Sequence, residues 1–294
     1  FVPAFEKIGK TCHMYLTKDH FILLHNVLNA DGVQAIAQFK KEVLFDDYRI
    51  SSQNDDRIAF TVDLSLLLRA LKSSVSMDGE KLQVKLVKKR TIGSERPTPF
   101  LTLESTGYKS AVIQDVPISS PLSRVDVHEL QVALDMAQDL PQTLVQVPDL
   151  LQLQSLVDRL KNVGEVLDVG ITQYGDFHLK VSTTAVTIGS DNRRLRVVGV
   201  RATDTSSSSL DENISSSARL EKALQRGEAS SVQVSIKHFA KSIQCHLTRP
   251  DAAFYGIAAE GACLTVIFQF FVLGTRQTDN SISLHCRLPV LDPG

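Results

Sequence analysis

Three neighbouring cysteine–histidine pairs are the first residues in the chain whose types could bind a metal. They are Cys12–His13, Cys245–His246 and His285–Cys286. Thiolate and imidazole are ligands that zinc prefers. However, adjacent side chains of a strand point to opposite faces, so each pair can give at most one ligand to any site. The sequence also lacks a C-x-x-C motif. We therefore expect buried thiols and ordinary histidines, with no metal and no cofactor.

Basic side chains are the second group with possible chemistry, because they recur on one face of the expected helices. The segment 58–74, IAFTVDLSLLLRALKSS, predicts a strand that runs directly into a helix. Its leucines at 64, 67, 68 and 71 follow the i, i+3, i+4, i+7 spacing of a face that packs on a sheet. Arg69 and Lys72 then lie on the opposite face, where they could hold an anion.

The same design returns in the second half of the chain. In the segment 231–244, SVQVSIKHFAKSIQ, the inward face is Ile236, Phe239, Ala240 and Ile243. We also expect helices at 2–9 and 149–163, each with basic outward residues. The outward basic residues of the four helices are Lys7, Lys10, Arg69, Lys72, Arg159, Lys161, Lys237 and Lys241. Most acidic residues fall in loops, so these helices would form a positive layer.

Composition restricts the class of protein. The chain has 294 residues, a formal net charge of -1 and a pI near 6.8. Such a balance argues against attraction to nucleic acid or membrane through net charge, but it allows a local basic face. The longest apolar run, at 262–274, is shorter than the roughly 18 residues of a membrane span. Four cysteines are too few for a disulfide scaffold, which favours a reduced, intracellular protein.

The order of the expected elements repeats along the chain. Each half reads as a helix, several strands with alternating polarity, a strand that runs into a helix, and several more strands, which predicts an internal repeat. The first domain would cover 1–118, and the second 143–294. Residues 119–142 would be a linker with one helical turn around 127–137, and the serine-rich stretch at about 201–231 would be an exposed, disordered insertion.

These features resemble a known family. The segment 45–74, FDDYRISSQNDDRIAFTVDLSLLLRALKSS, is similar to the core of the sliding clamps of the PCNA type. The serine-rich insertion, AVIQDVPI at 111–118 and SISLHCRLPVL at 281–291 point more narrowly to the Hus subunit family of the heterotrimeric DNA-damage checkpoint clamp, the nine-one-one ring. The resemblance covers nearly the whole chain as a pattern of elements.

The resemblance implies an α+β fold of two tandem clamp domains, with antiparallel sheets outside and helices on the inner face. Three different subunits would close a ring around duplex DNA in the nucleus, without sequence preference. The ring would meet a clamp loader and checkpoint or repair proteins, and no membrane. Subunits would join through edge strands at 110–118 and 185–198, and the edge residues are Val112, Ile113, Val116, Val186 and Ile188.

Two other functions remain open from the sequence. One is a replicative clamp that forms a trimer of identical subunits. The other is an enzyme for a small molecule, although the sequence has no G-x-x-x-x-G-K-[ST], H-E-x-x-H or G-x-S-x-G motif. The chain begins within an expected helix and without methionine, and no strand precedes that helix. We therefore expect an incomplete N-terminus and a strand in the first domain that lacks a neighbour.

Overall fold

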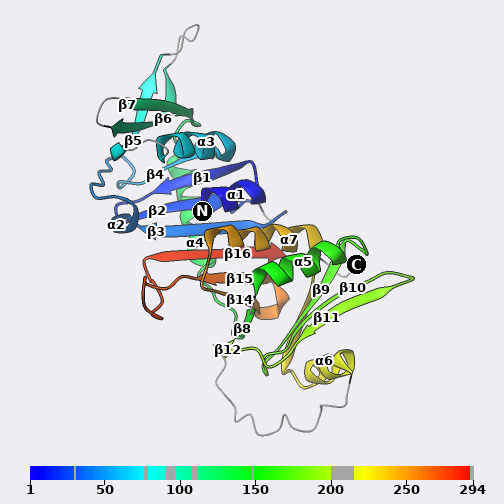
Figure 1. Ribbon diagram of the computed structural model, residues 1–294. Coiled ribbons are helices and arrows are strands. Elements are labelled where there is room, and N and C mark those ends of the chain that lie inside the picture. The colour runs from blue at the N-terminus through cyan, green and yellow to red at the C-terminus, as the bar shows by residue number, and fades with distance from the viewer. Residues whose placement is uncertain are drawn as a thin grey trace.

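The structure is a computed structural model that describes the chain except residues 30, 76–78, 91–96, 108–110, 148, 200–214 and 292–294. Its strands form one broad sheet and two smaller ones, and four helices lie in a row on one face of the broad sheet (Figure 1).

The first repeat runs from the N-terminus to residue 117. Its strands carry Val, Ile, Phe and Thr in alternation with polar residues, which suits a sheet with one buried face. The elements are α1 (Val2–Ile8), β1 (Thr11–Leu16), β2 (His20–His25), β3 (Gln34–Lys40), α2 (Lys41–Leu44), β4 (Ile58–Asp63), α3 (Leu64–Val75), β5 (Gly79–Lys89), β6 (Thr98–Gly107) and β7 (Ala111–Pro117).

The second repeat follows a connecting helix, α4 (Arg124–Met136). Its elements are β8 (Leu144–Val147), α5 (Leu150–Leu160), β9 (Val166–Thr172), β10 (Phe177–Ser182), β11 (Thr187–Asn192), β12 (Val197–Val198), α6 (Ser216–Gln225), β13 (Ala229–Ser235), α7 (Ile236–Ile243), η2 (Gln244–Thr248), β14 (Ala252–Ile257), η3 (Ala259–Gly261), β15 (Cys263–Gln269) and β16 (Ile282–Pro289).

Strand order confirms the predicted internal repeat. In the first repeat the strands lie in the order β3-β2-β1-β4, and in the second the order is β11-β10-β9-β13. Each repeat continues with a three-strand meander, β5-β6-β7 or β14-β15-β16, and all these pairs are antiparallel. The fold is therefore the expected α+β type with antiparallel sheets.

The two repeats join through a single ladder between β16 and β3. Six antiparallel residue pairs connect them, from Ile282 opposite Phe39 to Arg287 opposite Gln34. This joint makes the meander of the second repeat continuous with the first four strands, and β8 and β12 extend the same sheet to nine strands.

The helix row lies on the face of this sheet that carries the main core. Neighbours in the row are α3, α1, α7 and α5, in that order (Figure 1). The inward faces of α5 and α7 are as predicted, with Leu153, Val157, Ile236 and Phe239 buried. In α3 the buried stripe is shifted, because Ala70 is buried while the two leucines at 68 and 71 are only half-buried.

Helix α4 corrects the expectation of a linker with a single helical turn around 127–137, because the helix has 13 residues. Ser123 caps it, its hydroxyl accepting from the backbone N–H of Asp126, and the Asp126 carboxylate accepts from the Ser123 backbone in return. Val127, Leu130 and Leu134 form its buried stripe. They pack on the opposite face of the sheet from the helix row, against a cluster that comprises Tyr15, Ile22, Leu24, Val27, Ile36 and Ala59.

Helix α6 corrects the second expectation, an insertion disordered over 201–231. Residues 200–214 lie outside the described part of the chain, but Ser216–Gln225 is a helix and Ala229–Ser235 is a strand. Ser215 caps the helix by accepting from the backbone N–H of Ala218. The sequence is polar, so the helix depends on ionic contacts with the sheet beneath it, which are described below.

Strand β5 has one neighbour fewer than its counterpart in the second repeat. Among the described strands it pairs only with β6, whereas its counterpart β14 pairs with both β15 and β8. This agrees with the expectation of an unpaired strand in the first repeat.

The packing of α4 gives a stability prediction. Leu130 is fully buried, whereas Val132 in the same helix is 43% exposed. We expect Leu130→Ala to lower the free energy of unfolding by about 2–5 kcal/mol, because it leaves a cavity under the helix. Val132→Ala should change it by about 0.5 kcal/mol or less. Urea unfolding of both variants measures the difference, and equal losses would contradict the assigned packing of α4.

Candidate nucleic-acid interface and subunit edges

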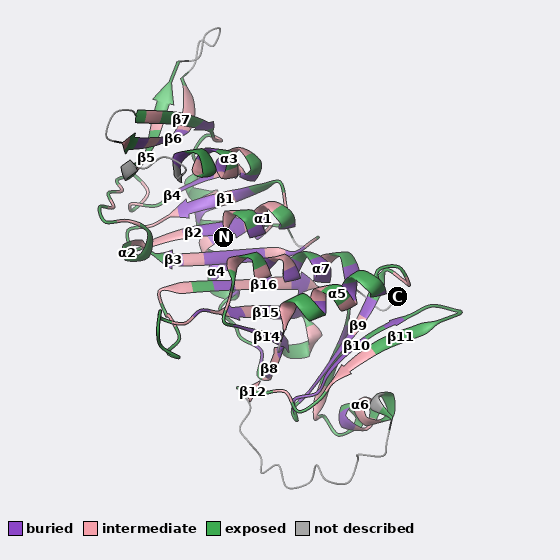
Figure 2. Cartoon of the chain, in the orientation of Figure 1, coloured by how far each residue is buried: buried purple, intermediate pink, exposed green. Residues whose placement is uncertain are grey.

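The outward faces of the helix row carry six of the predicted basic residues, and the other two, Lys10 and Lys161, lie just after the ends of α1 and α5. We call this surface the basic wall; it consists of Lys7, Lys10, Arg69, Lys72, Arg159, Lys161, Lys237 and Lys241, and all eight are exposed. Figure 2 shows α1, α3, α5 and α7 with exposed residues on the side away from the sheet. The structure thus brings the four helices together on one face, with their cations directed to solvent.

Ion pairs neutralise only part of the basic wall. Lys7 lies 3.5 Å from Glu6, and Lys161 lies 2.8 Å from Asp158. The Lys237 ammonium is 3.2 Å from Glu165, but both side chains are largely exposed. Lys10, Arg69, Lys72, Arg159 and Lys241 make no ion pair with any residue that the structure describes. These five cations are therefore available to an anion from outside.

Two half-buried histidines lie near Lys241 at the centre of the row. Burial lowers the pKa of His25, and the nearby Lys241 lowers it further. Burial and Lys241 also lower the pKa of His238. Both imidazoles are therefore neutral at pH 7, and the charge of this region comes from the lysine.

Asp63 fixes the start of α3, which carries Arg69 and Lys72. One carboxylate oxygen accepts from the Ser65 hydroxyl at 2.6 Å and from the backbone N–H groups of Ser65 and Leu66 at 2.9 and 3.1 Å. These bonds, with the Ser65 hydroxyl as the largest contribution, lower the pKa of Asp63. Because β4 ends at this residue, the strand and the helix share one rigid junction.

The predicted edge at 110–118 contains β7, and the one at 185–198 contains β11, each at the edge of its sheet. The segment 185–198 is not one strand, however, because β12 at its end pairs with β8 in the nine-stranded sheet. β7 pairs only with β6, and β11 pairs only with β10, among the described strands. Ile113 of β7 is 59% exposed and Ile188 of β11 is 42% exposed, and Val186, directly before β11, is 48% exposed; Val112 is half-exposed. Val116 was expected at the edge, but it is 3% exposed, because its side chain faces the core beside Leu101.

Comparisons with known proteins agree with this architecture. A family model described as "Hus1-like protein" matches residues 1–276. The chain belongs to the Hus1-like family. The checkpoint protein hus1 homolog of Dictyostelium discoideum is 27% identical over 256 residues, which cover 85% of this chain and 82% of that protein. The checkpoint protein HUS1 of Homo sapiens is 26% identical over 187 residues, covering 62% of this chain and 63% of that protein.

The solved structures support the fold of this Hus1-like chain. The proliferating cellular nuclear antigen of Entamoeba histolytica superposes with a TM-score of 0.59 at 9% sequence identity. The superposition covers 99% of this chain and 93% of the antigen. At this identity the likeness establishes a PCNA-like clamp fold.

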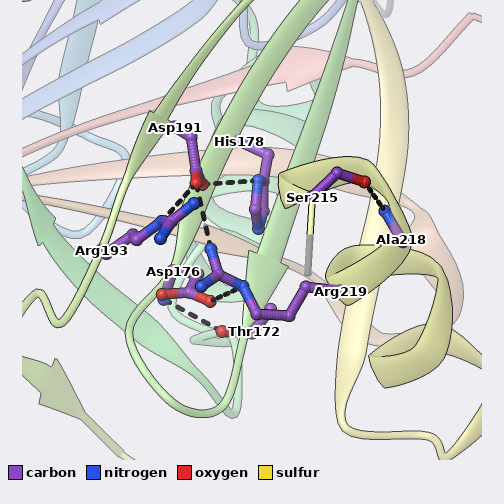
Figure 3. Close-up of polar contacts among 8 residues, drawn as sticks. All are labelled: Thr172, Asp176, His178, Asp191, Arg193, Ser215, Ala218 and Arg219. Atoms are coloured by element: carbon purple, nitrogen blue, oxygen red, sulfur yellow. Dashed lines mark hydrogen bonds and ion pairs between the residues drawn. The ribbon is translucent and has the colours of Figure 1, made fainter. Parts of the chain in front are cut away.

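A polar network beside β11 is a feature of this Hus1-like chain that sequence patterns did not reveal (Figure 3). The Asp191 carboxylate on β11 lies 2.8 Å from His178 Nδ1, 2.7 Å from Arg193 Nε and 3.0 Å from an Arg219 nitrogen. Arg219 also reaches Asp176 at 3.3 Å. Because Arg219 belongs to α6, the network attaches this helix to the edge strand.

The network is largely shielded from water. His178, Asp176, Asp191 and Arg219 each expose less than a fifth of their side chains. Burial lowers the pKa of His178, although the two aspartates oppose the shift. The imidazole is thus neutral, and two arginines balance two carboxylates. Leu220 completes the attachment by packing on Gly170, where a β-carbon would lie 2.7 Å from the leucine methyl.

No pairwise spacing in the sequence predicts this network, because its members come from two strands, the residues next to those strands and a separate helix. The one available signal was Gly170 within a buried strand, since such a glycine often marks the close approach of another element.

The described residues contain no group of three or more His, Cys, Asp or Glu side chains placed to hold a metal ion. All four cysteines are buried, as predicted, and Cys245 Sγ lies 3.6 Å from Cys286 Sγ. Among the described helices, none has both the length and the apolar character needed to cross a membrane.

The cap of α3 gives a pH prediction. The pKa of Asp63 is lowered on folding, so its stabilising effect is complete at neutral pH and is lost as the pH falls below about 4. Asp63→Ala should lower the free energy of unfolding by about 1 kcal/mol at pH 7. Asp63→Asn retains an acceptor but cannot ionise, so its stability should depend less on pH between 5 and 3. Thermal unfolding across this range measures both effects, and parallel pH profiles for wild type and Asp63→Asn would contradict them.

Proposed function

We propose that this Hus1-like protein is one subunit of a ring-shaped sliding clamp that acts in DNA-damage checkpoint signalling and repair. The ring contains two further paralogous subunits and encircles duplex DNA in the nucleus. The ring catalyses no reaction. A clamp loader places it on DNA, and there it recruits checkpoint or repair proteins. Its family and its PCNA-like fold support this role.

The observation that carries the proposal is the joint between β16 and β3. Inside the chain, the last meander strand of the second repeat pairs with the third strand of the first repeat. Their counterparts, β7 and β11, have no such partner among the described strands. One chain therefore contains one complete joint, between β16 and β3. Its edge strands β7 and β11 can each form a second such joint with a neighbouring subunit. Repeating the joint between subunits generates a closed ring of heterologous interfaces.

Each subunit then contributes two clamp domains, residues 1–118 and 143–294, connected by 119–142. The helix row follows the continuous sheet, so the basic wall of each subunit faces the hole. Lysine and arginine on helices contact phosphates without reading bases, which suits a clamp that moves along DNA. A ring is retained by enclosure, so a moderate number of cations suffices.

Charge reversal on the basic wall tests the proposal. Arg69, Lys72, Lys237 and Lys241 are exposed, so changing all four to Glu should leave the fold and ring assembly intact. Retention on circular duplex DNA should be lost. The slope of log affinity against log salt should become shallower by about 0.9 for each phosphate contact removed. Native mass measurement of the co-expressed three-subunit complex reports assembly, and salt titration of DNA binding reports the contacts.

A matched control reverses four exposed cations away from the helix row: Lys18, Lys81, Lys88 and Arg276. This variant has the same change in net charge, so it should keep DNA retention if position matters. Equal loss in both variants would show that only net charge acts. Loss of ring assembly with unchanged DNA binding in the first variant would show that the basic wall is a protein interface.

A further inference from the structure

Because the chain is an internal repeat, the pairing seen between β16 and β3 predicts how an incoming strand would pair with the edge strand β11. In both repeats a helix begins immediately after a strand, at Leu64 and at Ile236. The residues before them, Asp63 and Ser235, pair with Thr11 and Val166. These four residues align the two sheets without any assumption about sequence similarity.

Following the ladders from this alignment identifies the residues of β11 that match β3. His13 pairs with Leu24, which pairs with Ile36. At the same positions of the second repeat, Asp168 pairs with Lys180, which pairs with Gly189. Gly189 therefore corresponds to Ile36, and the residue before it, Ile188, corresponds to Ala35.

The internal joint then defines what must lie opposite these two positions. Ile36 lies opposite His285, and Ala35 lies opposite Cys286. In a ring built from the same joint, an incoming strand places one residue opposite Gly189, in the place of His285. Its next residue lies opposite Ile188, in the place of Cys286.

Next to Gly189, which has no side chain, lies Lys180, a cation that is unpaired among the described residues. Lys180 is the cross-strand neighbour of Gly189 and shares its face of the sheet. It is exposed and makes no ion pair with the described residues. Glycine places no side chain between Lys180 and the incoming strand. A groove continues from this point to α6, and its lining includes Asp168, Thr187, Asp191, Ser217 and Leu220.

The distance between the incoming strand and β10 determines which acidic side chain can reach Lys180. Neighbouring strands lie about 4.8 Å apart, so the incoming strand is about 10 Å from the backbone of β10. A glutamate extending toward the lysine ammonium spans this distance better than the shorter aspartate. On the opposite face, Ile188 is 42% exposed next to the buried Val181, which requires an apolar neighbour.

The edge strand β7 of this chain does not meet these requirements. Isolated bridges from Val62 to Ile118 and from Val234 to Val290 align β7 with β16. In this alignment Ile113 takes the place of His285, and Gln114 takes the place of Cys286. Pairing between identical copies would set an isoleucine beside Lys180 and an amide against Ile188. The partner at β11 is therefore a different chain.

We propose that the ring subunit that pairs with β11 carries a glutamate followed by an apolar residue on its edge strand, and that Lys180 binds this glutamate across Gly189. The inference rests on the proposed function, because it needs a ring. It adds the chemistry that distinguishes the correct neighbour from a second copy of this chain.

Carbodiimide cross-linking of the three-subunit ring tests the contact directly. This reagent joins a lysine to a carboxylate in contact with it, with no spacer. Mass spectrometry should find Lys180 linked to a glutamate on the partner's edge strand, with an apolar residue next in the sequence. Absence of a link from Lys180, or a link to an acidic residue elsewhere, would overturn the proposal.

Charge reversal supplies the second test. Lys180→Glu should weaken association with that partner at least about tenfold, because it opposes two like charges at the interface. Changing the linked partner glutamate to lysine should restore assembly with Lys180→Glu. Lys18→Glu, an equal charge change in the exposed turn between β1 and β2, should assemble as wild type.

The outcomes separate the two proposals. A wild-type ring that tolerates Lys180→Glu refutes the glutamate contact and leaves the clamp function intact. Failure of the wild-type chain to form a three-subunit ring refutes the proposed function itself. A stable trimer of this chain alone refutes the argument that β7 and β11 do not fit each other.

Discussion

The antiparallel ladder between β16 and β3 is the constraint on which the rest of the structure depends. It makes one sheet from two repeats, so the core beneath the helix row is continuous across the boundary between them. It also fixes the order of the helices, because α1 and α7 become neighbours only when their sheets are joined. A change that shifted this register by one residue would turn every side chain of β16 to the other face and separate the two halves of the core.

The helix row shows how one local design serves both packing and charge. At each strand-to-helix junction the strand ends and the helix begins without a loop, which sets the orientation of the helix relative to the sheet. Apolar side chains then hold the helix down, and the opposite face is free to be basic. Since the two faces share no residues, selection on charge can proceed with little effect on stability. Apart from Glu6, Asp158 and Glu165 beside the wall, the negative charge of the chain lies elsewhere, which explains a net charge near zero beside a positive wall.

The sequence was sufficient to predict the helices and strands that have strong hydrophobic periodicity. It was insufficient to predict the elements whose stability depends on residues distant in the chain. The amphipathic stripes of α5 and α7 and the alternation in the strands predicted the repeat and its helices. The row of helices on one face and the two edges were expected only because the sequence resembles the clamp family. Helix α4 was underestimated, although Ser123 and Asp126 form a recognisable cap and Val127, Leu130 and Leu134 have helical spacing. Helix α6 could not be expected from its serine-rich, polar surroundings, because Arg219 finds Asp176 and Asp191 only after the sheet has formed. Val116 was misplaced because strand alternation gives two faces without saying which one is covered.

The two repeats cover the outer faces of equivalent sheets with helices of different character. Helix α4 buries an apolar stripe on Tyr15, Leu24 and Ile36, whereas α6 relies on Arg219 and a few apolar contacts around Leu220 and Ala223. Elements with little apolar burial open at low free energy, independently of global unfolding. Amide protons of α6 should therefore exchange with solvent through local opening, while those of α4 exchange only when the first repeat unfolds. Helix α4 would thus be a permanent cover and α6 a detachable one, and α6 lies beside the edge strand β11, to which we assign the contact with the next subunit.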